Sequence, residues 1–282
     1  MTDALNTLKT NLDEIDKLND EFWMNSLDDR KRKELEFHDL DRDSSRMEES
    51  HANDTFEQFY GNKKYYKITN RSYGFVDDWI EKNAKGKVFL DYACGNGENA
   101  IKASLADASL SLGLDISSVS VNNAKRIAES KGCKNIRFFQ ADAENTKLPD
   151  NSIDAIVCSG MLHHLDLSYA FPELRRILKP GGKILAIEAL DYNPVIKFYR
   201  YLTPDMRTEW EKAHILSLKD VEFASRFFKV NRKDYWHVVG YAAGKFPILS
   251  SPLDFLDKIL EKIPLLQLMS WIFTFELEKE EI

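Results

Sequence analysis

The chain has 282 residues, of which 43% are hydrophobic and 30% charged, enough for one large domain with a buried core. Its net charge is −7, with 17 acidic against 8 basic side chains in the first 60 residues and a nearly neutral remainder. An acidic chain repels phosphate backbones, so we do not expect nucleic acid as a partner. The three cysteines are widely separated, which indicates a reducing compartment rather than a disulfide framework.

The N-terminal segment is predicted to be helical. A densely charged stretch, Asp28 to Glu49, follows as a second helix or a mobile segment, and its simplest interpretation is a solvated face. No signal peptide is evident, and the longest weakly charged apolar run, Ile263 to Phe275, is too short to span a bilayer, so we expect a cytoplasmic protein. At the start of the chain, before Asp28, we predict one amphipathic helix of about five turns, because apolar residues recur there at spacings of three and four. These residues are Leu5, Leu8, Leu12, Ile15, Leu18 and Phe22.

From Val88 onward, short apolar runs alternate with helical patterns, which is typical of a parallel sheet covered by helices on both faces. An aromatic and basic stretch, Tyr60 to Tyr73, leads into this region through a predicted helix at Gly74 to Asn83. The predicted strands are Val88–Tyr92, Leu110–Asp115, Ile136–Gln140, Ile153–Ser159 and Lys183–Glu188. The predicted helices between them are Ala100–Ala106, Ser117–Ser130 and Tyr169–Leu178, the last followed by a turn at Lys179–Gly182.

Beyond Glu188 the alternation ends. Tyr192 to Phe228 is predicted to be helical, and Phe227–Trp236 and Trp271–Glu278 are predicted strands. The stretch between these two strands is a long insertion, with a helical pattern interrupted by Pro252 and Pro264. Its apolar stripe is interpreted as packing on the domain rather than as contact with lipid or a partner.

The glycines Gly95 and Gly97 follow the first predicted strand and indicate a nucleotide-like ligand at its carboxyl end. The spacing also fits a dinucleotide fingerprint, but Asp91 precedes the glycines and would repel a pyrophosphate. A carboxylate there suits a cationic amine instead. S-adenosylmethionine carries such an amine and a sulfonium, and no phosphate, so charge complementarity favours this cofactor.

With these motifs the sequence resembles the class I S-adenosylmethionine-dependent methyltransferases over about Val88 to Glu188. The resemblance rests on Asp91-x-Ala93-x-Gly95-x-Gly97, with alanine replacing the family's first glycine, a departure that we expect to be mild. It also rests on Gly113–Ser117, Gln140–Ala143, Leu148–Asp154 and Leu178–Gly182, which come in the family's order.

The resemblance implies roles for individual residues. Asp115 would receive the ribose hydroxyls and Asp142 would lie at the adenine amino group, while Tyr66 or Arg71 would hold the methionine carboxylate. Each acid also has an ordinary structural alternative, since Asp91 and Asp115 could cap helices and Asp142 could form a turn. The full set of expected cofactor-binding residues is Asp91, Ala93, Gly95, Gly97, Asp115, Ile116, Asp142, Ala143, Ser159, Tyr66 and Arg71.

The acceptor is expected to face the segment Ser159–His164. No Asn/Asp-Pro-Pro-Tyr/Phe motif is present, which argues against nucleobase or protein-amide substrates and favours a small molecule. His163 or His164 could act as a general base, because an imidazole titrates near neutrality. Glu188 is a second candidate and His214 a third, although packing or capping explains each equally well. No cysteine or histidine cluster has metal-ligand spacing, so no metal is expected.

The resemblance therefore predicts an α/β Rossmann-like, doubly wound sheet of seven strands, mostly parallel with an antiparallel last strand, plus N-terminal helices and a helical insertion. Residues 1–84 would form a helical cap, 85–190 the cofactor-binding core, and 191–282 the acceptor-side helices and last two strands. The predicted function is methyl transfer to oxygen, nitrogen or carbon of a small-molecule or lipid-like metabolite. Alternatives are a different reaction with the same cofactor, or a non-catalytic binding protein; peripheral membrane contact is not favoured, and the oligomeric state stays open.

Overall fold

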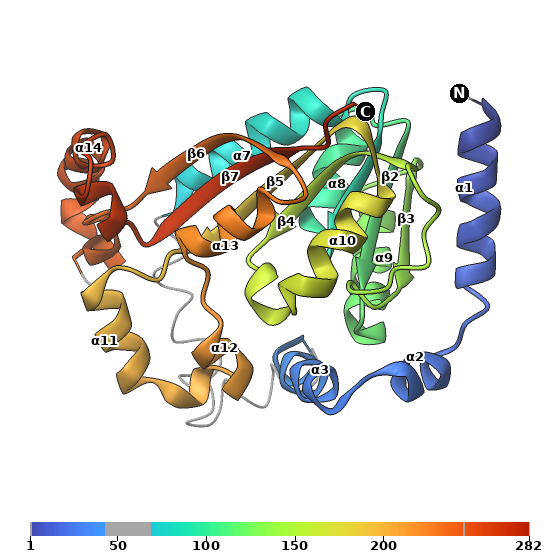
Figure 1. Cartoon of the computed structure of the whole chain (residues 1–282), viewed down its shortest axis with the longest axis horizontal. Helices are drawn as coiled ribbons and strands as arrows, with labels where there is room; N and C mark the ends of the chain where they lie inside the picture. Colours follow the sequence, from blue (N-terminus) through green and yellow to red (C-terminus); the bar gives the residue numbers. More distant parts are fainter. Residues whose placement is uncertain (1, 43–68, 245, 282) are drawn as a thin grey trace.

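The computed structural model describes residues 2–42, 69–244 and 246–281. Seven strands form one sheet in the order β3-β2-β1-β4-β5-β7-β6 (Figure 1). Among these strands β7 is antiparallel to both of its neighbours, β5 and β6, and the other neighbouring strands are parallel. The predicted sheet is confirmed. The strands are β1 Val88–Tyr92, β2 Leu110–Asp115, β3 Ile136–Gln140, β4 Ile153–Ser159, β5 Leu178–Ala189, β6 Lys229–Trp236 and β7 Ile272–Glu278.

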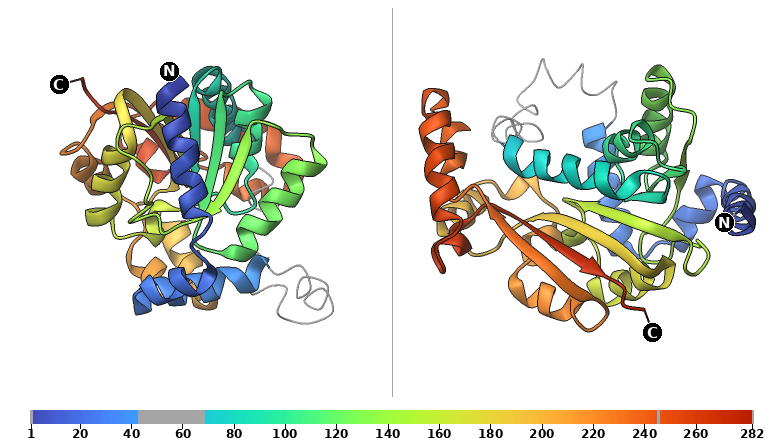
Figure 2. Two further views of the ribbon diagram at one scale, coloured as in Figure 1. Left: turned by 90° about the vertical axis from the view of Figure 1, so that its right-hand side faces the viewer. Right: turned by 90° about the horizontal axis from the view of Figure 1, so that it is seen from above.

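Helices cover both faces of the sheet because its central strands are apolar on both sides (Figure 2). In β1, Leu90 and its alternate neighbours face a core shared with α1 (Thr2–Ile15), α10 (Leu167–Ile177) and α13 (Leu218–Ala224). Phe89 faces the opposite core, which is closed by α7 (Asn70–Ala84). On that side α8 (Glu98–Leu105) and α9 (Ser118–Ser130) enclose a third apolar cluster around Phe138. Because β1 pairs in parallel with both β2 and β4, the carboxyl ends of these three strands lie side by side at the same end of the sheet.

The N-terminal segment differs from the prediction of one continuous helix from Leu5 to Phe22. Helix α1 ends at Ile15, and α2 (Asp20–Ser26) begins after Asn19, whose side chain accepts a hydrogen bond from the Phe22 amide at 2.9 Å. Asn19 is thus the N-cap of a new helix, because its side chain satisfies the Phe22 amide, which in one continuous helix would bond to the backbone oxygen of Leu18. Helix α3 (Asp29–Arg42) then crosses below the sheet edge (Figure 1).

The C-terminal part adds helices α11 (Pro194–Leu202), α12 (Glu209–Ala213) and α14 (Ser250–Leu260). Pro252 was predicted to interrupt the helix, but it lies in the first turn of α14, where the backbone amide has no partner within the helix, so the helix continues past it. The apolar stripe of this insertion is not packed on the domain throughout, because Phe255 and Leu265 are 66% and 76% exposed. Among the described residues, no helix combines the length and apolar character needed to cross a membrane.

The segment Lys179–Gly182, predicted as a turn, is an irregular part of β5. Leu178 pairs with Ile153, whereas Lys183 pairs with Ala155, so the extra residues form a bulge between the two pairings.

Candidate active site

The loop between β1 and α8 turns through three residues with positive φ, namely Ala93 (54°), Gly95 (53°) and Gly97 (79°). A Cβ atom at Gly97 would lie 2.5 Å from the Phe138 ring, so this position requires glycine for both its conformation and its space. Ala93 holds a left-handed conformation that costs an alanine about 1–2 kcal/mol. The replacement of the family's first glycine is therefore less mild than its small size suggests.

Asp91 lies behind this loop and is 2% exposed. Its carboxylate accepts hydrogen bonds from the Ala100 amide at 3.1 Å and from Asn99 Nδ2 at 3.4 Å, so it caps the first turn of α8. Burial raises the pKa of Asp91 to about 7; the bonds from Ala100 and Asn99 oppose the shift, and the charge of Asp115 adds to it. Asp91 is absent from the lining of the neighbouring cavity, which differs from the expected direct exposure to a ligand.

A cavity of about 380 Å³ lies in front of the loop, at the carboxyl ends of β1, β2 and β4. Seven of the expected cofactor-binding residues line it: Ala93, Gly95, Asp115, Ile116, Asp142, Ala143 and Ser159. Gly97 shapes the turn without reaching the cavity, and Tyr66 lies outside the described residues. The sequence therefore located the part of this wall that follows the strands, but not the part that Arg30, Lys31, Glu34, Leu35 and His38 of the N-terminal segment supply.

Two aspartates give the cavity its acidic character. Asp115 accepts hydrogen bonds from the amides of Gly95 (2.8 Å) and Ser117 (2.9 Å), and this ties the glycine turn to the end of β2. Asp142 accepts from the amide of Glu144 at 2.9 Å, with its second oxygen 2.6 Å from Lys31 Nζ. These side chains bring negative charge to the cavity, although Lys31 and Arg30, which also line it, offset part of that charge.

Helix α3 closes the cavity, which the charged sequence of this segment did not predict. Lys31 forms ion pairs with Asp142 at 2.6 Å and Glu144 at 2.8 Å, and the Arg30 guanidinium donates to the backbone oxygen of His164 at 2.8 Å. Burial lowers the pKa of Lys31, but its two carboxylate partners outweigh that effect and raise the pKa above its ordinary value. The segment interpreted as a solvated face therefore has a buried, paired side as well.

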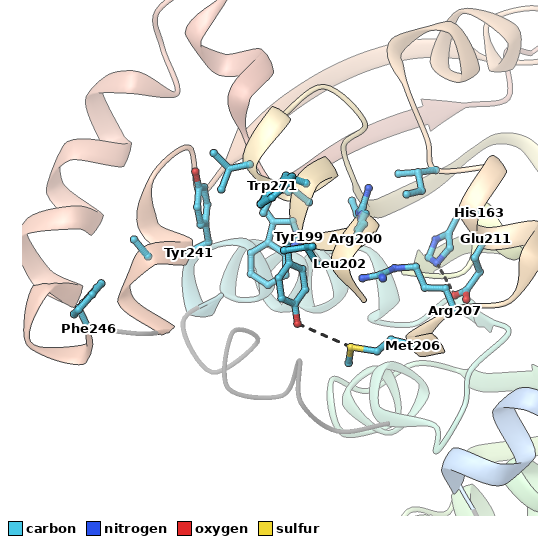
Figure 3. Close-up of a pocket in the computed structure, with 16 residues that line it drawn as sticks. His163, Tyr199, Arg200, Leu202, Met206, Arg207, Glu211, Tyr241, Phe246 and Trp271 are labelled. Carbon is cyan, nitrogen blue, oxygen red and sulfur yellow. Dashed lines mark hydrogen bonds and ion pairs between the residues drawn. The ribbon is translucent and has the colours of Figure 1, made fainter. Parts of the chain in front are cut away.

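A second cavity, of about 480 Å³, lies beside the first and is mostly apolar. It is bounded by α11, α12, the start of β7 and the insertion after β6 (Figure 3). Figure 3 shows His163, Arg207 and Glu211 together at one end, with Tyr241 and Phe246 at the other. The cavity thus has a polar end and an apolar end. Its apolar lining residues include Val195, Ile196, Phe198, Leu202, Ala242 and Trp271.

The two adjacent histidines separate the cavities. His163 lines the apolar cavity and His164 lines the acidic one, with their ring centroids 4.1 Å apart. His163 Nδ1 lies 2.7 Å from Glu188 Oε2, and His164 Nδ1 lies 2.9 Å from Glu34 Oε2. Burial lowers the pKa of His163, but the carboxylates of Glu188 and Glu211 outweigh this and raise the pKa to about 9.

Glu188 is 2% exposed and lines neither cavity. Its Oε1 accepts from the amides of Met161 (2.8 Å) and Leu162 (2.7 Å), and its Oε2 is paired with His163. This geometry makes Glu188 a positioning residue for the loop after β4 rather than a group that meets a substrate.

Glu211 is a residue that the sequence analysis missed. It lines the apolar cavity, and its Oε1 lies 3.7 Å from His163 Nε2 and 3.4 Å from His164 Nε2. Burial raises the pKa of Glu211, but the two histidines and the Thr208 amide outweigh this and lower the pKa. The capping-box pattern Thr208-x-x-Glu211 at the start of α12 was visible in the sequence, but it signals a helix start and not a site.

The structure does not bring Arg71 or His214 to either cavity. The Arg71 guanidinium is held by Glu261, with contacts at 3.0 and 2.5 Å, and by Asp254 at 3.3 Å. His214 stacks on Trp210 with ring centroids 3.6 Å apart. Both side chains have structural partners that account for them.

Known proteins match the part of the chain that carries the sequence motifs, about Val88 to Glu188. Residues 89–182 match the methyltransferase domain family. The chain is 35% identical over 116 residues to the uncharacterized methyltransferase YcgJ of Bacillus subtilis, which covers 41% of this chain and 45% of that relative. It is 38% identical over 111 residues to the ubiquinone/menaquinone biosynthesis C-methyltransferase UbiE of Francisella philomiragia, covering 37% and 43%. The matched segments thus span less than half of either relative.

The fold is also shared with a solved structure. An S-adenosylmethionine-dependent methyltransferase from Mesorhizobium loti superposes with a TM-score of 0.54 at 19% identity, covering 75% of this chain and 99% of that one. At this level of identity the likeness concerns the fold. It extends beyond the segment matched by sequence, since three quarters of this chain is covered.

Proposed function

Since this chain belongs to the class I S-adenosylmethionine-dependent methyltransferases, with S-adenosylmethionine as cofactor, we propose that it methylates an apolar small molecule bound in the second cavity. The observation that carries the proposal is the pairing of the two cavities across the histidines His163 and His164. One cavity is acidic and lies at the glycine turn, as a cationic cofactor requires. The other is apolar and of the size of small-molecule sites, which range over about 300–1,000 Å³.

The cofactor would lie in the first cavity with its ribose at Asp115 and its adenine toward Asp142. Asp115 has the support of its position, since it lines the cavity at the end of β2 while anchoring Gly95. For Asp142 to meet the adenine, its contact with Lys31 has to lengthen or rearrange. Asp91 would act on the cofactor's amine through its charge from behind the loop.

We propose that the described part of residues 1–84 acts as a cap on this cofactor-binding core, through helix α3; residues 43–68 lie outside the described residues. Helix α3 supports this, because its side chains Lys31 and Glu34 contact Asp142 and His164 in the cavity wall. A closed cavity excludes water from the reacting sulfonium, and exclusion of water strengthens the electrostatic interactions inside it.

The acceptor would place its reacting atom at the polar end of the second cavity, beside His163 and Glu211. Methyl transfer is an in-line displacement, and holding the two reactants in line can contribute about 7–11 kcal/mol to lowering the barrier. His163 touches this end directly, whereas Glu188 orients it through Nδ1. Glu211, whose pKa is lowered, would accept the proton of an acceptor that starts protonated, whereas His163, with its pKa raised to about 9, would donate a hydrogen bond to the acceptor.

The polar end also bears on the chemical class of the acceptor. Most of the lining is aliphatic or aromatic, so the body of the acceptor should be apolar. Arg207 and Glu211 at one end would bind a hydroxyl, carbonyl or acidic group. Two relatives support an acceptor of this class: the ubiquinone/menaquinone C-methyltransferase, and the 27-O-demethylrifamycin SV methyltransferase of Amycolatopsis mediterranei, 34% identical over 101 residues, which covers 35% of this chain and 37% of that relative.

The test is transfer of an isotope-labelled methyl group to metabolite extracts, with the labelled products identified by mass spectrometry. We expect label in the apolar fraction. Ala242→Phe should fill the acceptor cavity and abolish labelling while S-adenosylhomocysteine still binds, whereas Ala213→Phe, on an exposed position outside both cavities, should have no effect. No binding of S-adenosylhomocysteine would refute the cofactor site, and equal labelling by Ala242→Phe would refute the acceptor site.

A further inference from the structure

Three side chains between the two cavities converge on one point: His163, His164 and Glu211. One ligand atom from each lies within 4.8 Å of the others. The two imidazoles come from the loop after β4 and the carboxylate from the first turn of α12. Their side chains are 20%, 17% and 10% exposed, so the point is largely shielded from solvent while bordering both cavities.

Both imidazoles are oriented in the way that metal-binding histidines usually are. Glu188 Oε2 lies 2.7 Å from Nδ1 of His163, and Glu34 Oε2 lies 2.9 Å from Nδ1 of His164. A carboxylate on Nδ1 holds a proton there, so a metal ion that binds Nε2 has to replace only the proton on that nitrogen. Here both Nε2 atoms face the same oxygen, Glu211 Oε1.

The distances fit ligands of one ion better than a hydrogen-bonded pair. His163 Nε2 and His164 Nε2 lie 3.7 and 3.4 Å from Glu211 Oε1, beyond the usual 2.7–3.2 Å of an N–H···O bond. Zinc binds histidine nitrogen and carboxylate oxygen at about 2.0–2.2 Å, which in a tetrahedron separates neighbouring ligands by about 3.3–3.5 Å. A small adjustment of the side chains would therefore suffice.

The charge around the cluster also favours a cation. Three carboxylates, Glu34, Glu188 and Glu211, surround the two imidazoles. Two guanidinium groups lie nearby and both are engaged: Arg30 donates to Glu144 and to the backbone of His164, and Arg207 donates to the backbone oxygen of Thr203. A divalent ion would offset this concentration of negative charge in a shielded place.

We propose that His163, His164 and Glu211 bind one divalent transition-metal ion, such as Zn²⁺, at the boundary of the two cavities. Two imidazoles and one carboxylate form a donor set that leaves coordination positions open. Because His163 and Glu211 line the apolar cavity, an open position would face the acceptor. The role of the ion rests on the proposed function: it would bind an oxygen atom of the acceptor and lower the pKa of the acceptor's hydroxyl group.

No metal was expected from the sequence, because no cysteine or histidine cluster has the spacing typical of metal ligands. His163 and His164 are adjacent, but Glu211 lies 47 to 48 residues further along the chain, and only the packing of α12 against the loop after β4 joins them. A second group, Glu34, His38 and His164, shares His164 and uses helix α3 instead. The test must separate the two.

The experiment is a titration of the full chain, previously treated with a chelator, with Zn²⁺ by calorimetry and with Co²⁺ by visible absorption. We expect one ion per chain and the d–d absorption of Co²⁺ in a site with nitrogen ligands. Glu211→Gln should weaken binding at least 100-fold, and Glu188→Gln should weaken it about 10–100-fold by freeing the imidazole orientation. Glu209→Gln, an exposed glutamate on the same helix, should leave binding unchanged.

Glutamine at 211 can still accept the Thr208 amide bond, and the melting temperature will show whether α12 is intact. His164→Gln gives a second variant that leaves α12 untouched. Absence of ion binding, or equal binding by the parent and Glu211→Gln, would overturn the proposal. So would loss of binding in His38→Gln with Glu211→Gln unaffected, since that result would place the ion on α3. A chain that binds Zn²⁺ but transfers no methyl group would refute the proposed function and not the metal site.

Discussion

The substitution Asp91→Asn tests the electrostatics of the cofactor site most directly. Burial raises the pKa of this carboxyl to about 7, compared with 3.8 for an ordinary aspartate. Between pH 4 and 7 the folded chain keeps a proton that the unfolded chain has lost. Stability therefore falls as the pH rises through this window, by about 1.4 kcal/mol per pH unit and by about 4 kcal/mol in all.

An asparagine at 91 has no charge to bury and can still accept the hydrogen bond of the Ala100 amide. After subtraction of the lost charge-assisted bonds, we expect the variant without ligand to be about 2–4 kcal/mol more stable than the parent at pH 8. For a chain of this size that raises the melting temperature by about 5–10 °C. At pH 4 the difference should disappear.

Cofactor binding should change in the opposite direction. The cationic amine of the cofactor favours ionised Asp91, so the affinity of the parent for S-adenosylhomocysteine should rise between pH 6 and 8. In Asp91→Asn the affinity should be flat over that range and about 10–100-fold weaker at pH 8. Calorimetry at four pH values measures both quantities, and Asp78→Asn, on the exposed side of α7, is the matched control.

Two results would refute the reasoning separately. If Asp91→Asn melts at or below the parent's temperature at pH 8, burial of the ionised carboxyl is not costly. If its affinity for S-adenosylhomocysteine equals that of the parent, the charge behind the glycine turn does not act on the ligand.

Three further predictions concern the cofactor cavity and its surroundings. Asp115→Asn should weaken S-adenosylhomocysteine binding by about 1.5–3 kcal/mol, or roughly 10–150-fold, since one side-chain oxygen cannot serve both backbone amides and the ribose; unchanged calorimetric affinity would contradict the assignment. Gly97→Ala should lower the free energy of unfolding by about 2–4 kcal/mol in urea, whereas Gly132→Ala, with a similar φ but open space around it, should cost about 1 kcal/mol. Arg71→Met should destabilise the chain by about 1–3 kcal/mol, because the Glu261 carboxylate loses its cationic partner, and it should leave the affinity for S-adenosylhomocysteine unchanged. A large loss of affinity would instead indicate that Arg71 binds the cofactor.

The sheet and the part of the first cavity's wall that follows the strands could be predicted from the sequence because both depend on local patterns. Buried parallel strands are short apolar runs, and a tight turn needs glycine at Gly95 and Gly97. Asp115 is the last residue of β2 and Asp142 comes shortly after β3, so the parallel pairing of these strands places both at the carboxyl end of the sheet.

The parts that could not be predicted depend on segments far apart in the chain. Lys31 contacts Asp142 across 111 residues, and Thr208 donates to Glu34 across 174 residues. In their local sequence, Lys31 and Glu34 do not differ from charged residues on a protein surface. Whether a carboxylate such as Asp91 faces a ligand or caps a helix depends on a rotamer, and both outcomes leave the same sequence pattern.

Helix α3 contacts the wall of the first cavity and also α12, the helix that bounds the second cavity. Lys31 holds Asp142, Glu34 holds His164 and Thr208, and the Arg30 guanidinium lies 4.7 Å over the Trp210 ring of α12. On the proposed placement of the cofactor, S-adenosylhomocysteine would leave only after these ion pairs have separated. Opening motions of this kind are slower than the chemical step in many enzymes. We accordingly expect a rapid first equivalent of methylated product, followed by a steady phase whose rate is set by the escape of S-adenosylhomocysteine.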